Sequence, residues 1–440
     1  MLNWRRNVYF LMVTSFLASS GMSIIMPFLP LYVEQLGVTD PKAVGMWSAI
    51  AYSANFLAAA FFSPVWGNLA DRFGRKLMIL RSGFGMGIVI FLMGTVHSVE
   101  ALVGLRLLNG VIAGFIAASN AFVGSNTPRE HVGYALGLIQ GASVAGNIMG
   151  PLFGGAIVYI ASVRYVFFLT SIGLLISSAT VLIFVHEKFE RPTVALKTRS
   201  ELAAASVQAH PTHHPHALGS SVRALLGQRA IMALLFATFL AQFSQSTVEP
   251  ILTSFVKTLE TPQAYLTLMV GLVFSVAGLS TFIAAPLLGR YADRHGYKRV
   301  LQFALAGAAL MYLPQGLVHT SWQLLWIRFA LGAFIGGILP SIQSLISHLT
   351  PDSQRATGFG LNQSAVYVGN FLGPLVGGVV SGWLGFRAIF SIASVFLLAD
   401  LLWVISSVPN PQAQAQSKLA ADNRKGATEL EPEATASQEE

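Results

Sequence analysis

Long apolar runs alternate with short polar turns along this 440-residue chain. A helix needs roughly 20 consecutive, mostly apolar residues to cross a lipid bilayer. Runs of about that length occur at 8–33, 44–66, 77–96, 99–121, 132–158 and 164–186, and again at 229–256, 267–288, 299–318, 322–348, 356–383 and 387–408. The pattern predicts an all-α membrane protein with twelve transmembrane helices in two pseudo-symmetric bundles of six.

Two segments interrupt this pattern, one in the middle of the chain and one at its end. The middle segment, 187–228, contains the run A-H-P-T-H-H-P-H and too few large apolar residues to form a core, so we expect a flexible cytoplasmic linker. Histidine tracts can bind metal, but a flexible tract offers no fixed geometry, and we expect no metal site. The predicted units are a bundle at 1–186, this linker, a bundle at 229–408 and a disordered cytoplasmic tail at 409–440.

Composition agrees with a lipid environment, because 54% of the residues are hydrophobic and only 10% are charged. Soluble domains carry about 25% charged residues. The absence of cysteine excludes disulfides and cysteine-ligated metal or redox sites. The N-terminal M-L-N-W-R-R-N leads into an apolar stretch that continues through Val33, which predicts an uncleaved first span rather than a signal peptide.

Most of the 27 lysine and arginine residues fall in segments on the same side of the membrane as the N-terminus. Cytoplasmic loops carry such an excess of positive charge, so we expect both termini in the cytoplasm. This distribution accounts for the net charge of +8, and no nucleic-acid partner is expected.

The two halves of the chain share sequence motifs at a nearly constant spacing. The decapeptide G-N-L-A-D-R-F-G-R-K at 67–76 returns in weakened form at 289–299, an offset of 222 residues (289 − 67). The run G-N-I-M-G-P-L-F-G-G at 146–155 returns around Gly373 and Pro374 at an offset of 223 (373 − 150). The spacing predicts two parallel structural repeats, related by an axis along the membrane normal.

These motifs resemble the major facilitator superfamily, and within it the twelve-span drug/proton antiporters. The run at 67–76 is similar to the superfamily loop between the second and third spans, and the run at 146–155 to the fifth-span motif of antiporters. M-P-F-L-P-L-Y-V-E-Q-L-G at 26–37 and S-T-V-E-P-I-L-T at 246–253 look close to the MdtG-type multidrug transporters. The resemblance covers about 5–408.

The resemblance implies a function and a mechanism. Members of this group move drug-like, amphipathic and often cationic compounds out of the cell by alternating access, and inward proton flow drives the export. The implied protein is a monomer in the bacterial inner membrane that contributes to antibiotic resistance. It needs a small-molecule substrate, protons and the lipid bilayer, and no cofactor beyond the proton gradient.

The charged loop between the second and third spans is predicted to act as a conformational latch. Asp71 can accept hydrogen bonds from Arg72 or Arg75 in one state of the transporter, while the loop glycines allow a tight turn. The alternative is that the basic residues only hold the loop in the cytoplasm. The predicted latch residues are Gly67, Asp71, Arg72, Gly74, Arg75, Asp293 and Arg294. In the second copy, Tyr297 replaces Arg75, so we expect a weaker latch there.

The glycine-proline motifs have two interpretations. Glycines four residues apart give a helix a flat face for close packing, and proline can bend the helix. The first interpretation is simple helix packing. The second is that these bends lie at the interface between the halves and restrict ion leak. The predicted antiporter-motif residues are Gly146, Gly150, Pro151, Gly154, Gly155, Gly373 and Pro374.

Glu249 is the main candidate for proton coupling. The repeat aligns Pro250 with Pro27 and places Glu249 opposite Met26, and no acidic residue occurs between Asn7 and Val33. Loss of hydration in the membrane favours the protonated form of a carboxyl group, so this group could bind and release a proton and also attract a cationic substrate. The alternative is a hydrogen-bonded structural acid near the outer mouth.

Arg106 is the second candidate, about seven residues into the fourth span. A charge at membrane depth usually faces a cavity or a partner, and the family's fourth-span arginine suggests a role in proton transfer. Alternatively, the side chain reaches the outer headgroups. Arg328 occupies the same place in the second half but lacks a polar neighbour like Asn109, which makes it the weaker candidate. Asp400, in the twelfth span, is expected to be structural.

Polar and adaptable apolar side chains at membrane depth are candidates for substrate contact. The predicted cavity residues are Met26, Gln140, Asn147, Gln245, Asn362, Tyr367 and Asn370. The main alternative function is proton-coupled symport or export of a sugar or another small metabolite. A membrane receptor or an enzyme is disfavoured, because the chain has no G-x-x-x-x-G-K-[ST] loop, no H-E-x-x-H motif and no large soluble sensing domain.

Overall fold

The computed structural model describes residues 4–187, 222–351 and 354–409. Within these ranges the chain is almost entirely helical, and one isolated β-bridge joins Glu260 to Thr320. Most of the predicted linker, with its histidine run, and nearly all of the predicted tail lie outside the described residues.

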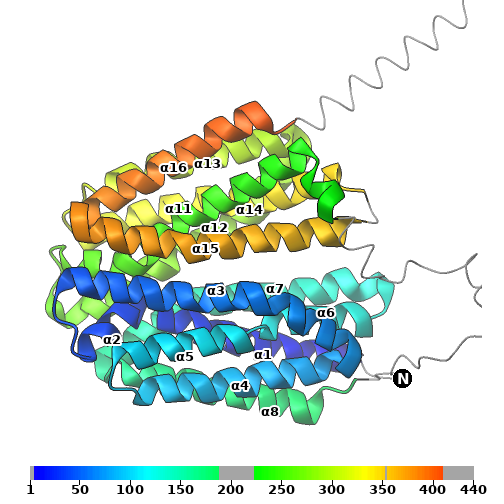
Figure 1. The fold of residues 1–440 in the computed structure, drawn as a ribbon, viewed down its shortest axis with the longest axis horizontal. Helices are drawn as coiled ribbons and strands as arrows, with labels where there is room; N and C mark the ends of the chain where they lie inside the picture. Colours follow the sequence, from blue (N-terminus) through cyan, green and yellow to red (C-terminus); the bar gives the residue numbers. More distant parts are fainter. Residues whose placement is uncertain (1–3, 188–221, 352–353, 410–440) are drawn as a thin grey trace, which may run out of the picture.

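Two groups of helices follow one another along the chain (Figure 1). The first group consists of α1 (Trp4–Ile25), the 3-10 turn η1 (Met26–Phe28), α2 (Leu29–Gln35), α3 (Pro41–Phe73), α4 (Arg75–Thr95), α5 (Val99–Ile112), α6 (Phe115–Asn126), η2 (Arg129–His131), α7 (Val132–Ile160) and α8 (Arg164–Phe184). The second consists of α11 (Arg229–Lys257), η3 (Gln263–Tyr265), α12 (Leu266–His295), α13 (Tyr297–Gln315), α14 (Ser321–Leu349), α15 (Arg355–Leu384) and α16 (Phe386–Ser407).

Eleven helical segments in the described residues are long and apolar enough to cross a membrane. The predicted run at 299–318 is not among them, because Lys298 and Arg299 in the first turn of its helix α13 lower the mean hydropathy of this short helix. However, α13 packs against α14 and α16 in the second half, as α4 packs against α5 and α8 in the first. Its place in the bundle is therefore that of a twelfth spanning helix.

Both halves use the same pairs of helices. The main contacts of the first half are α1 with α7, α3 with α5, and α4 with α8, and those of the second are α11 with α15, α12 with α14, and α13 with α16. The pairs α3–α15 and α7–α12 join the halves, which lie side by side in Figure 1. This repeated pairing is the pseudo-twofold arrangement that the sequence offset predicts.

The helix ends form two opposite ends of the molecule. The linker end carries Trp4, Phe184, Arg229 and Ser407, which border the two chain termini and the linker. The other end, here called the distal end, carries the turns that follow α2, α7, α11 and α15.

Two helices of the first half are broken where their second-half counterparts are continuous. The first span is interrupted by the 3-10 turn at Pro27, whereas the equivalent Pro250 lies inside α11. The fourth span is interrupted between α5 and α6 at Gly114, whose φ of 133° favours glycine. Trp66 Nε1 donates to the Val111 carbonyl at 2.6 Å, and so satisfies a backbone oxygen beside the break.

Many large apolar side chains point away from the bundle. Ile160 is 83% exposed, Trp383 is 86% exposed and Phe61 is 72% exposed. Exposed apolar surface on this scale marks contact with lipid or with another protein, and on spanning helices it fits the hydrocarbon of a bilayer. The chain is therefore a multi-pass membrane protein.

Candidate functional site

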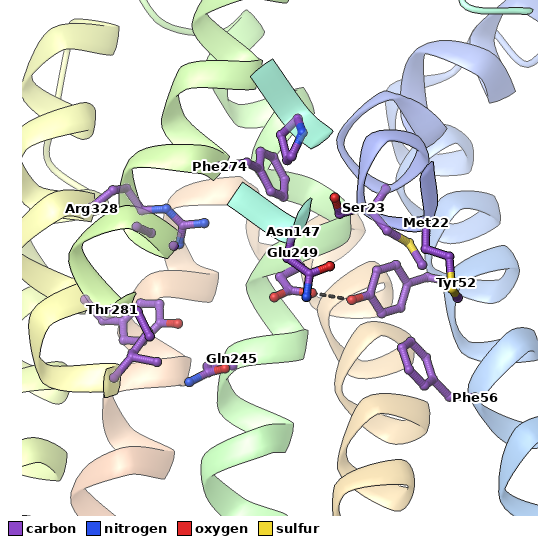
Figure 2. Close-up of a pocket in the computed structure, with 16 residues that line it drawn as sticks. Met22, Ser23, Tyr52, Phe56, Asn147, Gln245, Glu249, Phe274, Thr281 and Arg328 are labelled. Carbon is purple, nitrogen blue, oxygen red and sulfur yellow. Dashed lines mark hydrogen bonds between the residues drawn. The ribbon is translucent and has the colours of Figure 1, made fainter. Parts of the chain in front are cut away.

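A cavity of about 450 Å³ lies between the two halves (Figure 2). From the first half it is lined by Met22, Ser23, Met26, Tyr52, Phe56, Asn147 and Pro151, and from the second by Gln245, Glu249, Phe274, Ala277, Gly278, Thr281, Tyr312, Arg328 and Ile335. Most of this wall is apolar or aromatic, with few charged groups.

Glu249 is the acidic group of this cavity and binds across the interface between the halves. It is carried by α11, and its carboxylate accepts a hydrogen bond from the hydroxyl of Tyr52 on α3. Tyr52 is only 5% exposed, so this donor is held in a packed environment. Figure 2 shows this bond as a dashed line. The acid therefore contacts the opposite half directly, a partner that sequence analysis did not identify.

Arg106 is buried within the first half, with 2% of its surface exposed. Its Nε donates to the Ala51 carbonyl at 3.1 Å, and its Nη2 lies 3.2 Å from the sulfur of Met26. The side chain therefore does not extend to the outer headgroups. It lies behind Met26 rather than in the cavity wall, and it does not contact Glu249.

Arg328, the weaker candidate from sequence, lies in the cavity wall instead. It is 6% exposed, its Nε has no hydrogen-bond partner among the described residues, and its guanidinium carbon lies 6.0 Å from the centroid of the Phe274 ring. In Figure 2 it lies on the opposite side of Glu249 from Tyr52. The 222-residue offset makes Arg328 the equivalent of Arg106 (328 − 106), but only Arg328 lines the cavity.

Of the predicted cavity residues, Met26, Asn147 and Gln245 line the cavity. The remaining four lie elsewhere: Gln140, Asn362, Tyr367 and Asn370. This differs from the expectation, because two of these side chains form hydrogen bonds within the second half and two lie on other surfaces.

Asn362 and Asn370 tie α15 to α11 within the second half. Asn362 Oδ1 accepts from Thr238 Oγ1 at 2.6 Å, and Asn370 Oδ1 accepts from Ser246 Oγ at 2.5 Å. Gln140 lies on an exposed face of α7. Tyr367 lines a second cavity, of about 530 Å³, between α3 and α15 toward the linker end.

The distal end of the interface is closed by contacts between the halves. Thr253 Oγ1 donates to the Pro27 carbonyl at 2.5 Å. Further out, Lys257 forms an ion pair with Glu34. At the α7–α12 junction the rings of Tyr159 and Tyr265 stack, with centroids 6.3 Å apart. The central cavity is therefore sealed on its distal side.

The predicted latch residues lie at the linker end. Gly74 (φ 93°) and Gly296 (φ 101°) form the sharp turns between consecutive helices. Gly67 lies inside α3, which continues to Phe73, and a Cβ there would meet no atom within 4 Å, so this glycine does not permit a close approach of another helix. Arg72 and Arg294 are exposed. The side chain of Asp71 lies outside the described residues.

Glu187, which follows α8, caps the start of α4. The carboxylate of Glu187 accepts from the backbone N–H groups of Arg75 at 3.0 Å and Lys76 at 2.9 Å. Free N–H groups at a helix start are stabilised by an anion. In the second copy, Tyr297 Oη donates to Asp293 in the last turn of α12 at 2.5 Å, so the tyrosine contacts the predicted latch acid directly. Sequence analysis did not predict either contact.

The glycine-proline motif of α7 uses two faces of the helix. A Cβ at Gly146, Gly150 or Gly154 would lie within 2.5 Å of an atom of α1 or η1. A Cβ at Gly155 would lie 2.7 Å from the Thr267 carbonyl of α12. The first three glycines therefore pack within the first half, and Gly155 allows close approach of the second half.

The second copy repeats this arrangement. A Cβ at Gly373 would lie 2.6 Å from the Phe243 carbonyl of α11, and one at Gly378 would lie 2.7 Å from the Cβ of Ala49 on α3. Pro374 lies inside the continuous helix α15. One face of each helix therefore packs within its own half and another lies at the interface between the halves; a role of the motif in restricting ion leak stays a prediction.

Asp400 is fully buried in α16, away from the cavity, and neither carboxyl oxygen has a hydrogen-bond partner among the described residues. Burying an unpaired charge is costly, so a neutral carboxyl group fits this position better than a carboxylate.

Comparison with known proteins points to one family. A family model described as Major Facilitator Superfamily matches residues 11–270 and 234–433. A curated relative called multidrug resistance protein MdtG, from Serratia proteamaculans (strain 568), is 38% identical over 403 residues, which cover 92% of this chain and 94% of the relative. The protein of the same name from Enterobacter lignolyticus (strain SCF1) is 36% identical, covering 94% of this chain and 95% of the relative.

Solved structures show the same fold at low sequence identity. The nucleoside transporter NupG matches with a TM-score of 0.72 and 14% identity, over 92% of this chain and 99% of that one. A bacterial homologue of the human lysosomal transporter Spinster matches with a TM-score of 0.71 and 13% identity, over 91% of this chain and 96% of that one.

Proposed function

Because this chain belongs to the Major Facilitator Superfamily, we propose that it is a multidrug efflux transporter that exports drug-like amphipathic compounds in exchange for protons. Relatives that match over nearly their whole length are named multidrug resistance proteins. The single observation that carries the proposal is Glu249, a carboxyl group in a mostly apolar cavity between two halves that can move against each other.

The cavity suits an amphipathic compound of modest size. Its volume of about 450 Å³ lies within the usual range for small-molecule sites. Phe56, Phe274, Met22 and Met26 offer aromatic rings and flexible thioethers, which adapt to ligands of different shape. Glu249 supplies a single negative charge for a cationic group.

Proton coupling follows from competition for Glu249. A proton and a cationic substrate cannot both neutralise the same carboxylate, so binding of one releases the other. Alternating access then exposes the cavity to opposite sides of the membrane in turn. The proton gradient is the energy source in this scheme, and the protein works as a monomer without a cofactor.

Charge placement supports a bacterial inner-membrane topology with both termini in the cytoplasm. Arg72, Arg75 and Lys76 lie at the linker end, as do Lys298 and Arg299 of the second half. Basic residues favour the cytoplasmic side, so the sealed distal end faces outward. In this orientation the structure corresponds to a state closed to the outside.

Transport in everted membrane vesicles tests the proposal. In energised vesicles, an exporter takes substrate into the acidic lumen and releases protons outward, so a lumenal pH dye should report alkalinisation when a drug panel is added. Glu249→Gln should abolish this signal. Glu260→Gln, which removes an exposed acid at the distal surface, should keep it.

Two results would overturn the proposal. A normal proton signal in Glu249→Gln, with the variant inserted at wild-type levels, would reject Glu249 as the proton carrier. Substrate movement in the same direction as protons would favour the alternative, proton symport of a sugar or another metabolite.

A further inference from the structure

Among the described residues, one face of α11 carries the polar contacts between this helix and the first half at the distal end. Glu249, Thr253 and Lys257 are spaced four residues apart and therefore share a face of the helix. Their partners in the first half are the Tyr52 hydroxyl, the Pro27 carbonyl and the Glu34 carboxylate. This row of contacts holds the halves together on the distal side of the cavity.

The innermost contact differs from the other two, because a change of charge in the cavity alters it. Thr253 is neutral and buried. Lys257 and Glu34 are 30% and 37% exposed, so water and salt weaken their pairing. Glu249 lines the cavity, and among the described residues Tyr52 is its hydrogen-bond partner. A hydroxyl bonds a carboxylate about twice as strongly as a neutral carboxyl group.

The surroundings of Glu249 leave this bond to depend on its protonation. The other charged or titratable groups in the cavity wall are Tyr312 from α13 and Arg328 from α14, and neither hydrogen-bonds to Glu249. Arg106 lies behind Met26 and is bonded there. Protonation of Glu249 therefore weakens the contact with Tyr52 without a replacement partner in place.

We propose that the Tyr52–Glu249 hydrogen bond is an interlock that keeps the empty, deprotonated carrier closed at its distal end and so prevents protons from leaking without substrate. The proposal rests on the proton-coupled export proposed above. It makes Tyr52 a positioning residue for coupling, which acts through the carboxylate of Glu249.

The need for an interlock follows from which forms of an antiporter are allowed to change state. An exporter must change state with a proton bound and with substrate bound. If the empty, deprotonated form also changes state, protons cross with no substrate exchanged. The Tyr52–Glu249 bond is strongest in that third form and weaker when Glu249 is protonated. A cationic substrate at Glu249 displaces the Tyr52 hydroxyl and frees the halves to move.

The repeat supports a role for this bond beyond packing. By the sequence offset, Phe274 is the equivalent of Tyr52 (274 − 52 = 222) and Met26 is the equivalent of Glu249 (249 − 26 = 223). Phe274 and Met26 line the same cavity with no hydroxyl or carboxyl group. The fold therefore tolerates apolar side chains at these positions, as Phe274 and Met26 show. Tyr52 and Glu249 add a protonation-dependent contact on one side of the cavity only.

Proton leak in liposomes tests the interlock. The purified full chain is placed in phosphatidylethanolamine–phosphatidylglycerol vesicles with a trapped pH dye, and a pH gradient is imposed without substrate. Tyr52→Phe, which removes one hydroxyl, should raise the leak rate roughly tenfold, the factor expected for loss of a hydrogen bond to a charged group. Tyr32→Phe removes a buried tyrosine hydroxyl that donates to the Met93 carbonyl within the first half, away from the cavity, and should leave the leak at the wild-type rate.

The double variant Tyr52→Phe/Glu249→Gln should leak no faster than wild type, because the leaking proton travels on Glu249. A wild-type leak rate in Tyr52→Phe, with substrate-driven exchange intact, would overturn the interlock alone. No substrate-driven proton exchange in the wild type would overturn the proposed function, and the interlock with it.

Discussion

The two halves of this transporter share their backbone packing down to individual hydrogen bonds. Ser53 Oγ of α3 donates to the Phe371 carbonyl of α15 at 2.7 Å, and Ser275 Oγ of α12 donates to the Ile148 carbonyl of α7 at 2.6 Å. These two bonds occupy equivalent positions at offsets of 222 (275 − 53) and 223 (371 − 148). The interface between the halves is therefore built from the same contact, made once in each direction.

The same halves differ in the polar side chains that they carry at equivalent positions. In the first half, Asn109 Nδ2 donates to Asn55 Oδ1 at 2.8 Å and Arg106 is bonded internally. In the second half, Leu331 and Ala277 replace this amide pair, and Arg328 faces the cavity. The equivalent positions are Met26 and Glu249, Tyr52 and Phe274, Asn55 and Ala277, and Arg106 and Arg328.

This difference shows which positions can change independently in the two copies. Glycine contacts and serine-to-carbonyl bonds between helices are retained in both copies, since they set how closely helices pack. Cavity-lining side chains carry no such constraint. As a result, the acid of the second half takes its hydrogen-bond donor from the first half, and the site is complete only when the halves meet.

Moving the acid between halves should have the largest effect. In Met26→Glu combined with Glu249→Met, the transplanted carboxyl group would lie beside Arg106, whose Nη2 is 3.2 Å from the Met26 sulfur. A paired arginine keeps a carboxylate ionised, so substrate-driven proton exchange should be lost, as in Glu249→Gln. Vesicle exchange measurements test this. Recovery of coupling in the double variant would mean that the two positions are interchangeable.

Filling a glycine contact between the halves should have an intermediate effect, whichever half carries the glycine. Gly155→Ala places a Cβ 2.7 Å from a backbone oxygen, and Gly378→Ala places one 2.7 Å from another Cβ. Each should lower the free energy of unfolding by about 1–3 kcal/mol, the usual cost of overpacking. Thermal melting in detergent measures this.

The control for these variants is Gly173→Ala on α8, where a Cβ meets no atom within 4 Å. Its melting temperature should match or exceed that of the wild type, because alanine favours a helix. Equal melting temperatures for Gly155→Ala and Gly173→Ala would mean that the two halves are less closely packed than the structure indicates.

Removing the outermost contact should have the smallest effect. Lys257→Gln breaks an ion pair that is partly exposed, and such pairs contribute at most about 1 kcal/mol. The transport rate should change by less than about fivefold, and the difference should disappear at high salt because salt screens the charges. A proton leak in this variant as large as in Tyr52→Phe would show that the whole row of contacts, rather than its innermost member, controls leak.

The sequence contained the information for the architecture. Apolar runs of spanning length and a constant repeat offset led to the family and to a helical fold with two matched halves, because both signals are local or periodic. α13 was the least apolar run, and the breaks at Pro27 and Gly114 were not predicted, since the apolar pattern continues through them. Arg81 lies within α4, with its guanidinium carbon 3.5 Å from the Trp66 ring centroid, a contact that the apolar pattern does not indicate.

No local sequence pattern identified the hydrogen-bond partners of the key residues. Tyr52 is 197 residues from Glu249 in sequence, and its alignment with that acid depends on how α3 crosses α11. Glu187 caps α4 from 111 residues away. Residue type and depth in the membrane identified Glu249 as the candidate acid, and only the packing of the halves identified what it binds.

The break at Gly114 gives the first half a joint that the second half lacks. The equivalent glycine, Gly336, lies inside the continuous helix α14, where a Cβ would lie 2.9 Å from the Thr281 carbonyl. If the linker end of the interface narrows during transport, the break lets α6 move separately from α5, which holds Arg106, whereas the continuous α14 would tilt as a unit and carry Arg328 with it. Arg106 would then stay fixed through the transport cycle, and the position of Arg328 would change with the side to which the pocket opens.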